Sequence, residues 1–299
     1  MLIFSTWLFP YETTMITVIW ISLLGLALWF GIVLTRDFLA HKNSLEDSSW
    51  LKTSIIGFVV NFFDVLGIGA FAPQTALLKF TKQTKDKHIP GTMNVANTLP
   101  VLFQALIFIT IVEVESITLV LMFVSAALGA VLGAGVVAKM SEKKIRLVMG
   151  FALLITAFFM VATSLEWIQG GGEAIGLQGG KLAIAVIVNF GLGALMTAGI
   201  GLYAPCMALV FALGMSPQVA FPIMMGSCAF LMPPASVRFI REKAYNRKAA
   251  VAMAIPGIVA VGIAAFIIES LPLDVLRWVV IVVIVYTSGV MLHSGFTKK

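Results

Sequence analysis

Two seven-residue phrases of one pattern lie inside apolar segments of this chain. Residues 67–73 read GIGAFAP, and residues 199–205 read GIGLYAP. Glycine permits a sharp reversal of the backbone, and proline is tolerated in the first turn of a helix, where its missing N–H costs little. We therefore expect a turn in each phrase and a short helix that begins at Ala70 or Leu202. The unpaired N–H groups and positive dipole end of such a helix suit an anion.

Polar side chains lie close to both phrases. Gln74 follows the first tip, and the next apolar spans carry polar residues in TMNVANTLP and MMGSCAFLMPP. Phe71 and Tyr203, at matching positions, either shape the cavity or serve as ordinary core aromatics. For the polar residues, the alternative role is hydrogen bonding between packed helices. The candidate substrate-binding residues are Gly67, Ile68, Gly69, Ala70, Phe71, Gln74, Asn94, Asn97, Thr98, Gly199, Ile200, Gly201, Leu202, Tyr203, Cys206, Ser227 and Cys228.

Asp64 is the one carboxylate well inside an apolar segment, one turn before the first tip. An ionisable group there is costly, so it is a functional candidate by default. Asp64 could carry a coupling proton, hold a cation, or be a protonated acid bonded to Asn61 or another neighbour. Met196 stands at the equivalent position of the second half, so any coupling would be asymmetric. We also expect Pro100 and the pair Pro233–Pro234 to break the spans that follow the tips.

Other site chemistries find no pattern in the sequence. Cys206 and Cys228 fit small buried hydrophobes, and the three histidines are scattered, so we expect no metal site. No nucleotide-binding GK[ST] loop, HExxH or nucleophile elbow is present. We therefore expect no cofactor and no enzymatic activity.

The composition places the chain in a lipid bilayer. Hydrophobic residues make up 60% and charged residues 11% of its 299 residues, and the mean hydropathy is +1.03. Several apolar stretches reach the ~20 residues that a helix needs to cross the hydrocarbon, and no barrel pattern appears, so we expect an all-α polytopic membrane protein. The net charge of +6 resides in short clusters between apolar segments. These clusters indicate topology and contact with anionic lipid, and we expect no nucleic-acid partner.

The distribution of basic residues requires two segments that do not cross the membrane. The apolar segments fall at about 15–35, 51–80, 90–112, 117–138, 145–165, 181–213, 217–239, 249–269 and 273–295. Basic clusters occupy residues 36–52, 79–90, 139–146 and 238–248. If every segment crossed, the lysines of 79–90 would face outside, against the positive-inside tendency. If 51–80 and 181–213 are instead re-entrant hairpins that turn at their glycines, every basic cluster lies inside.

This topology predicts two repeats of opposite orientation. Residues 51–165 and 181–295 are each expected to form a re-entrant hairpin plus three transmembrane helices. An N-terminal transmembrane helix and a cytoplasmic loop in 1–50 precede the first repeat. A Gly-rich extracytoplasmic linker, 166–180, joins the two repeats. The N-terminus lies outside and the C-terminus in the cytoplasm. Inverted repeats with broken helices are typical of secondary transporters that bind substrate near the midplane. The alternative is two ordinary helices kinked by Gly and Pro.

A run of small residues is the remaining packing signal. Gly129 and Gly133 lie four apart in SAALGAVLGAG. Small residues at this spacing let helices approach closely, either within one chain or between the subunits of a homodimer. The sequence leaves both options open.

The duplicated Gly-x-Gly-x-x-x-Pro phrase, the basic loop after its first copy and the small polar span after each copy resemble the TauE/SafE (TSUP) sulfite exporter family over about 51–295. Gly67, Gly69 and Pro73, and Gly199, Gly201 and Pro205, match its motif. Ala70 and Leu202 stand where the family usually has a further glycine, and Asp64 matches no family position that we can assign. The resemblance implies export or uptake of sulfite or organosulfonates in a prokaryotic inner membrane.

These observations favour a secondary transporter of small anions. The alternatives are an anion channel on the same scaffold and a carboxylate transporter coupled to H⁺ or Na⁺. Because the membrane potential is worth about 2.3 kcal/mol per charge per 100 mV, export of an anion needs no coupling ion. Uptake needs one, and Asp64 is then the candidate.

Overall fold

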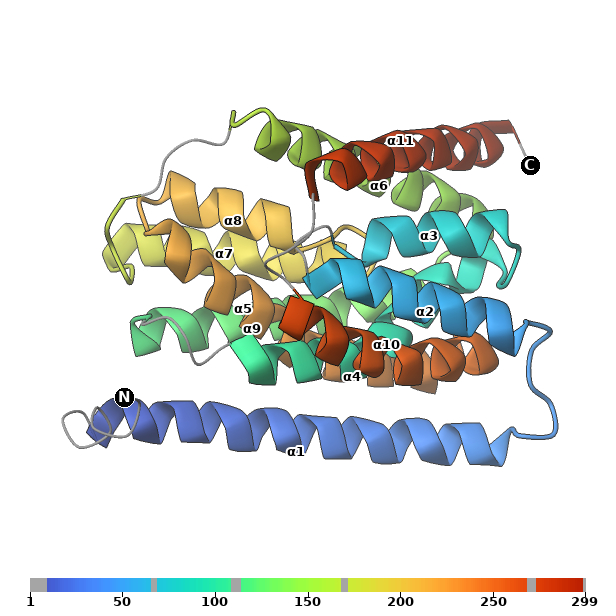
Figure 1. Ribbon diagram of the computed structural model, residues 1–299, viewed down its shortest axis with the longest axis horizontal. Helices are drawn as coiled ribbons and strands as arrows, with labels where there is room; N and C mark the ends of the chain where they lie inside the picture. Colours follow the sequence, from blue (N-terminus) through green and yellow to red (C-terminus); the bar gives the residue numbers. More distant parts are fainter. Residues whose placement is uncertain (1–9, 66–68, 109–113, 168–171, 268–272, 298–299) are drawn as a thin grey trace.

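The computed structural model describes residues 10–65, 69–108, 114–167, 172–267 and 273–297, which form a bundle of α-helices (Figure 1). The helices described are α1 (Pro10–Ala40), α2 (Trp50–Val65), α3 (Phe71–Phe80), the 3₁₀ turn η1 (Asp86–His88), α4 (Ile89–Phe108), α5 (Ser116–Ala138), α6 (Glu142–Ser164), α7 (Gly179–Met196), α8 (Tyr203–Ala212), α9 (Pro217–Arg241), α10 (Arg247–Ile267) and α11 (Leu273–Thr297). The prediction of an all-helical fold is confirmed for this part of the chain.

The surface of the bundle is compatible with an integral membrane protein. Six of the described helices are long and apolar enough to cross a membrane. Large apolar side chains cover the outside, including Leu128, Ile187 and Phe266, the last of which is 94% exposed. The most buried of the six windows lies in α9, where 83% of the residues are buried, against 22% in α1. Thus α9 is a central helix and α1 a peripheral one.

The two segments with the repeated phrase are broken helices that turn back on themselves. The backbone N–H of Ser49, just before α2, donates to the Oε1 atom of Gln83, just after α3, at 2.8 Å. In the second half, the Lys181 Nζ atom near the start of α7 bonds the carbonyl of Leu213 after α8, at 3.0 Å. The α2–α3 hairpin occupies one end of the long axis and α7–α8 the other, so α3 and α8 both begin toward the middle (Figure 1).

Helices of the two halves interlock. In the second half α10 packs against α2 and α4, and in the first half α5 packs against α7 and α9. The central contact joins α4 to α9, and α6 packs along α11 on one side of the bundle (Figure 1). Helix α1 lies on the opposite side, where it contacts α9 and α4. Each hairpin is therefore held mainly by the other half of the chain.

Small residues let α5 and α7 approach very closely. A Cβ atom added at Gly129 would lie 1.9 Å from the Phe190 carbonyl oxygen, and one at Gly193 would lie 2.2 Å from that of Ala126. Gly133 faces Ala194 in the same way. The glycine pair that the sequence left open therefore packs within the chain. Whether the protein also forms a homodimer stays a prediction.

The expectation that prolines break the spans after the hairpins is wrong. Helix α4 continues through Pro100, and α9 continues through Pro233 and Pro234. A proline removes one hydrogen bond of the helix, but packing against neighbouring helices allows the helix to continue past it. Gly257 of α10 makes room for the first ring, because a Cβ atom there would lie 2.8 Å from Pro100 Cγ.

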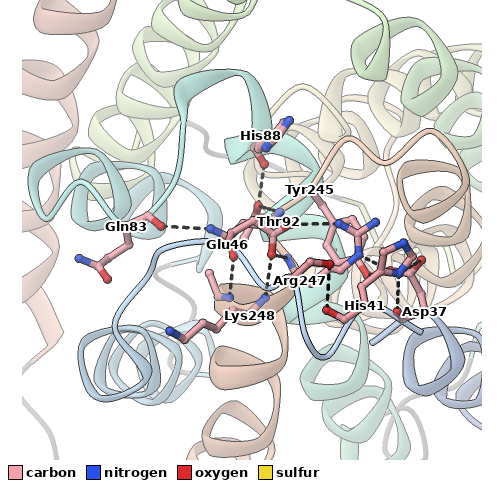
Figure 2. A network of polar contacts seen from close by, with 12 residues as sticks. Asp37, His41, Glu46, Gln83, His88, Thr92, Tyr245, Arg247 and Lys248 are labelled. Atoms are coloured by element: carbon pink, nitrogen blue, oxygen red, sulfur yellow. Dashed lines mark hydrogen bonds and ion pairs between the residues drawn. The ribbon is translucent and has the colours of Figure 1, made fainter. Parts of the chain in front are cut away.

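The basic loops meet at one end of the bundle. Arg247, which is 8% exposed, pairs with Asp37 at 2.8 Å and Glu46 at 3.0 Å. The same cluster includes Tyr245, whose hydroxyl donates to Asp37 at 2.6 Å. Its burial, and then this hydrogen bond, raise the pKa of Tyr245, so that the hydroxyl stays protonated. Figure 2 shows how these side chains tie the end of α1 to the start of α10.

Further contacts join the other basic loops to this cluster. The side chain of Asn246 donates to the Gln83 carbonyl at 3.2 Å. Asp86 pairs with Lys79 and Arg146, and Glu242 pairs with Lys139. Loops 36–52, 79–90, 139–146 and 238–248 thus lie together.

Candidate functional site

Both tips place a helix start just after the glycines of the repeated phrase. Helix α3 begins at Phe71 after Ala70, and α8 begins at Tyr203 after Leu202, in agreement with the predicted helix starts. Each turn uses one glycine with positive φ, a region that other residues rarely adopt. It is the second glycine of the phrase at the first tip, Gly69 (+85°), and the first glycine at the second tip, Gly199 (+105°). Gly67 and Ile68 lie outside the described residues. Both phrases therefore place a helix N-terminus beside a glycine turn.

Open space borders both tips. A Cβ atom added at Gly69 or Gly201 would meet nothing within 4 Å. The neighbouring Ile200 and Leu202, by contrast, are almost fully buried. A side chain added at either glycine would therefore meet no packed neighbour.

Asp64 caps the first tip. One of its oxygens, Oδ1, accepts a hydrogen bond from the Ala70 N–H at 2.6 Å, and its side chain is almost fully buried at 5% exposure. The hydroxyl of Tyr203, from the second tip, interacts with this carboxylate, and the Cys228 thiol is within electrostatic range of it. No Lys, Arg or His of the described chain forms an ion pair with Asp64. The fold has thus brought the carboxylate of one half to the aromatic tip residue of the other.

A chain of buried amides connects α2, α3, α4 and α10. The Asn61 amide donates to Asn97 Oδ1 at 3.1 Å, the Asn97 amide donates to Gln74 Oε1, and the Gln74 amide reaches the sulfur of Met253 at 3.2 Å. Asn61 therefore bonds Asn97 rather than Asp64. Because all three amides are nearly inaccessible, this chain fixes the first hairpin against the core.

Polar residues of the second half lie on the facing helices. Ser227 of α9 accepts from the Asn189 amide at 3.2 Å. Across the α4–α9 contact, Thr98 bonds Ser236 at 2.8 Å. The Asn94 amide donates to Pro90 and reaches the Thr197 carbonyl beside the second tip, at 3.5 Å.

The predicted residues divide into two groups. Asp64, Ala70, Tyr203 and Cys228 meet around the tips, and Asn94 joins them through the turn after α7. Gln74, Asn97 and Ser227 make bonds between the hairpins and α4 or α9, and Thr98 joins α4 to α9. Phe71 and Cys206 are buried core residues.

The sequence reasoning missed Gln104 and Asn189. Gln104 lies on α4 beside the Tyr203 hydroxyl and is 1% exposed. Neither its amide nitrogen nor its oxygen has a hydrogen-bond partner of good geometry in the structure. A signal existed, because Gln104 lies two helical turns after Asn97 and so on the same helix face.

The tips therefore combine helix N-termini, one carboxylate without a cation, and the Gln104 amide, which contacts Tyr203 without a hydrogen bond of good geometry. Such an arrangement can bind a small polar ligand through N–H donors. Comparison with known proteins adds no assignment, since no family model, curated protein or solved structure matches this chain.

Proposed function

We propose that this chain is a secondary transporter of small anions, sulfite or organosulfonates, which bind between the N-termini of α3 and α8. One observation carries the proposal: both helices begin inside the bundle, at the tips of hairpins that enter from opposite ends (Figure 1). The first N–H groups of a helix and its positive dipole end attract an anion. Two such ends provide an anion site without a buried Arg or Lys.

We further infer that the two halves are inverted repeats. Suppose that each of the five helices α2 to α6 corresponds, in order, to one of the five helices α7 to α11. The observed contact between α2 and α10 then corresponds to the observed contact between α7 and α5, and that between α4 and α10 corresponds to that between α9 and α5. The α4–α9 and α6–α11 contacts are each converted into themselves. This correspondence is what a two-fold relation between the halves requires. Rocking of one repeat against the other would then open the site to each side in turn.

The charge distribution supports the orientation in the membrane. The loops that carry most of the lysines and arginines are joined at one end, which we assign to the cytoplasm of a prokaryotic inner membrane. The N-terminus of α1 then lies outside and the end of α11 inside. The tips lie between these faces, at the depth where transporters with broken helices bind substrate.

The substrate class rests on two grounds. The resemblance to the TauE/SafE family points to sulfur oxyanions, and the tips offer neutral donors from the backbone and from Gln104. An oxyanion accepts several such hydrogen bonds at once. A carboxylate would be bound by the same groups, so substrate identity must be measured.

The test is flux of labelled sulfite and of methanesulfonate into proteoliposomes, with Gly201→Leu as the key variant. Its Cβ atom would enter open space and its φ is not in the left-handed region, so the side chain fills the site without backbone strain. We expect saturable flux in the native protein and at least a tenfold loss in the variant. The matched control is Gly25→Leu, on the outer helix α1, where a Cβ atom also meets nothing.

Two outcomes would count against the proposal. Native flux of neither anion would remove the sulfur assignment, and a carboxylate panel would follow. Flux that does not saturate and lacks counterflow would instead favour the channel.

A further inference from the structure

The carboxylate of Asp64 occupies the position where an anion would bind the first tip. Its Oδ1 atom lies 2.6 Å from the Ala70 nitrogen, and Ala70 is the residue from which α3 starts. The second tip has Met196, an uncharged residue, at the position equivalent to Asp64. One half-helix therefore has a built-in anion, and the other does not.

We propose that Asp64 is a tethered competitor for the anion site, so that the substrate binds together with one proton taken up by Asp64. This inference rests on the function proposed above and specifies its coupling ion. When the substrate approaches the α3 N-terminus, two negative charges share one set of N–H donors. Since no cation pairs with Asp64 in the described structure, these charges repel strongly in a medium of low dielectric constant.

Protonation removes this conflict. A protonated Asp64 is neutral, its hold on the Ala70 N–H weakens, and its new O–H can donate to the substrate. Among the described residues, the titratable groups that face it are Tyr203 of α8 and Cys228 of α9. Both are neutral when protonated, and neither supplies a compensating positive charge. The proton comes from water and returns to water when the anion leaves.

Gln104 provides the second indication that a ligand belongs here. Its side chain is 1% exposed and lies beside the Tyr203 hydroxyl, yet both polar atoms lack a partner of good geometry. A buried amide whose only polar contact, with Tyr203, has poor hydrogen-bond geometry costs free energy that a ligand can recover. An oxyanion between the tips would accept from this amide.

The coupling has a measurable consequence for transport. A monovalent anion that moves with one proton carries no net charge, so an imposed membrane potential does not drive it. A pH gradient does. The variant Asp64→Asn keeps an oxygen for the Ala70 N–H but carries neither a charge nor a titratable proton. It is therefore expected to move the anion alone, driven by the potential.

The decisive experiment measures methanesulfonate binding to the purified full chain in detergent, in weak buffer with a pH indicator. Methanesulfonate stays ionised throughout, so any proton taken up belongs to the protein. We expect close to one proton per bound anion and, on the alkaline side, about tenfold weaker binding per pH unit, as linkage requires. Asp64→Asn should bind without proton uptake, while the exposed-site control Asp47→Asn should behave as native.

The outcomes separate this inference from the proposed function. Binding or flux without proton uptake in the native protein overturns the inference and leaves the transporter proposal standing. Native binding of neither methanesulfonate nor sulfite overturns this inference and removes the sulfur assignment of the proposed function. If Asp64→Asn does not fold, proton uptake by the native protein decides alone.

Discussion

The contact between α5 and α7 leads to a prediction in which two neighbouring glycines respond oppositely to the same substitution. In Gly193→Ala, the new Cβ atom would lie 2.2 Å from the Ala126 carbonyl oxygen. Ordinary contact needs about 3.5 Å, so the helices must separate by more than about 1 Å. The obstacle is backbone, which cannot rotate away as a side chain can.

The magnitude follows from this forced separation. Overpacking a tight interface costs about 1–3 kcal/mol, and the benefit of Ala over Gly in a helix, about 0.5–1 kcal/mol, offsets part of it. Gly191→Ala, two residues earlier on the same helix, meets nothing within 4 Å and should keep the benefit alone. We therefore expect the two variants to differ by about 2 kcal/mol in stability.

The assay is reversible unfolding in mixed micelles, with thermal inactivation as a second readout. The m-value of each variant must match that of the native chain, so that a midpoint shift reports stability. Equal stability of Gly193→Ala and Gly191→Ala would refute the close backbone contact between the first half and the second. Gly129→Ala, whose Cβ atom would face Phe190 from the other helix, should repeat the loss.

Three further perturbations test the polar contacts. Arg247→Met leaves the carboxylates of Asp37 and Glu46 without their cation and should cost about 2–4 kcal/mol, measured as unfolding free energy and as faster proteolysis between α1 and α2. Tyr245→Phe should cost about 1 kcal/mol at neutral pH. Because the folded pKa of Tyr245 is raised by burial, the native hydroxyl contributes stability below the unfolded pKa of about 10 and loses it as pH rises; the variant should lack this alkaline loss in a pH series of melts. Asn97→Leu leaves two buried amides short of a partner and should lower stability by about 2–4 kcal/mol, whereas the exposed Asn43→Leu should change it little.

The sequence alone determined the environment and the helical class. An apolar content of 60% cannot be buried in a chain of this size, so its large side chains face outward, as at Phe266. The same reasoning located both helix starts to within a residue, because a Gly-rich turn before a Pro in the first helical turn is a local signal. Local signals need no knowledge of what packs against them.

Local signals also produced the error at the prolines. Pro100 looked like a break, but Gly257, far along the chain, gives its ring room, and the helix continues. Gln104 was missed for the same reason, because its role depends on a residue far along the chain. It follows the helix periodicity of Asn97, but only the approach of Tyr203 from the other half makes it part of the site.

Tertiary structure alone decided which polar groups meet. Asp64 might have bonded any neighbour within a turn, and the fold gives it the Ala70 N–H from the start of the next helix and Tyr203 from the other half. Sequence spacing fixes contacts within a helix, because the backbone repeat is regular. Contacts between helices depend on how ridges and small residues such as Gly129 and Gly193 let the helices approach, and this depends on the whole bundle.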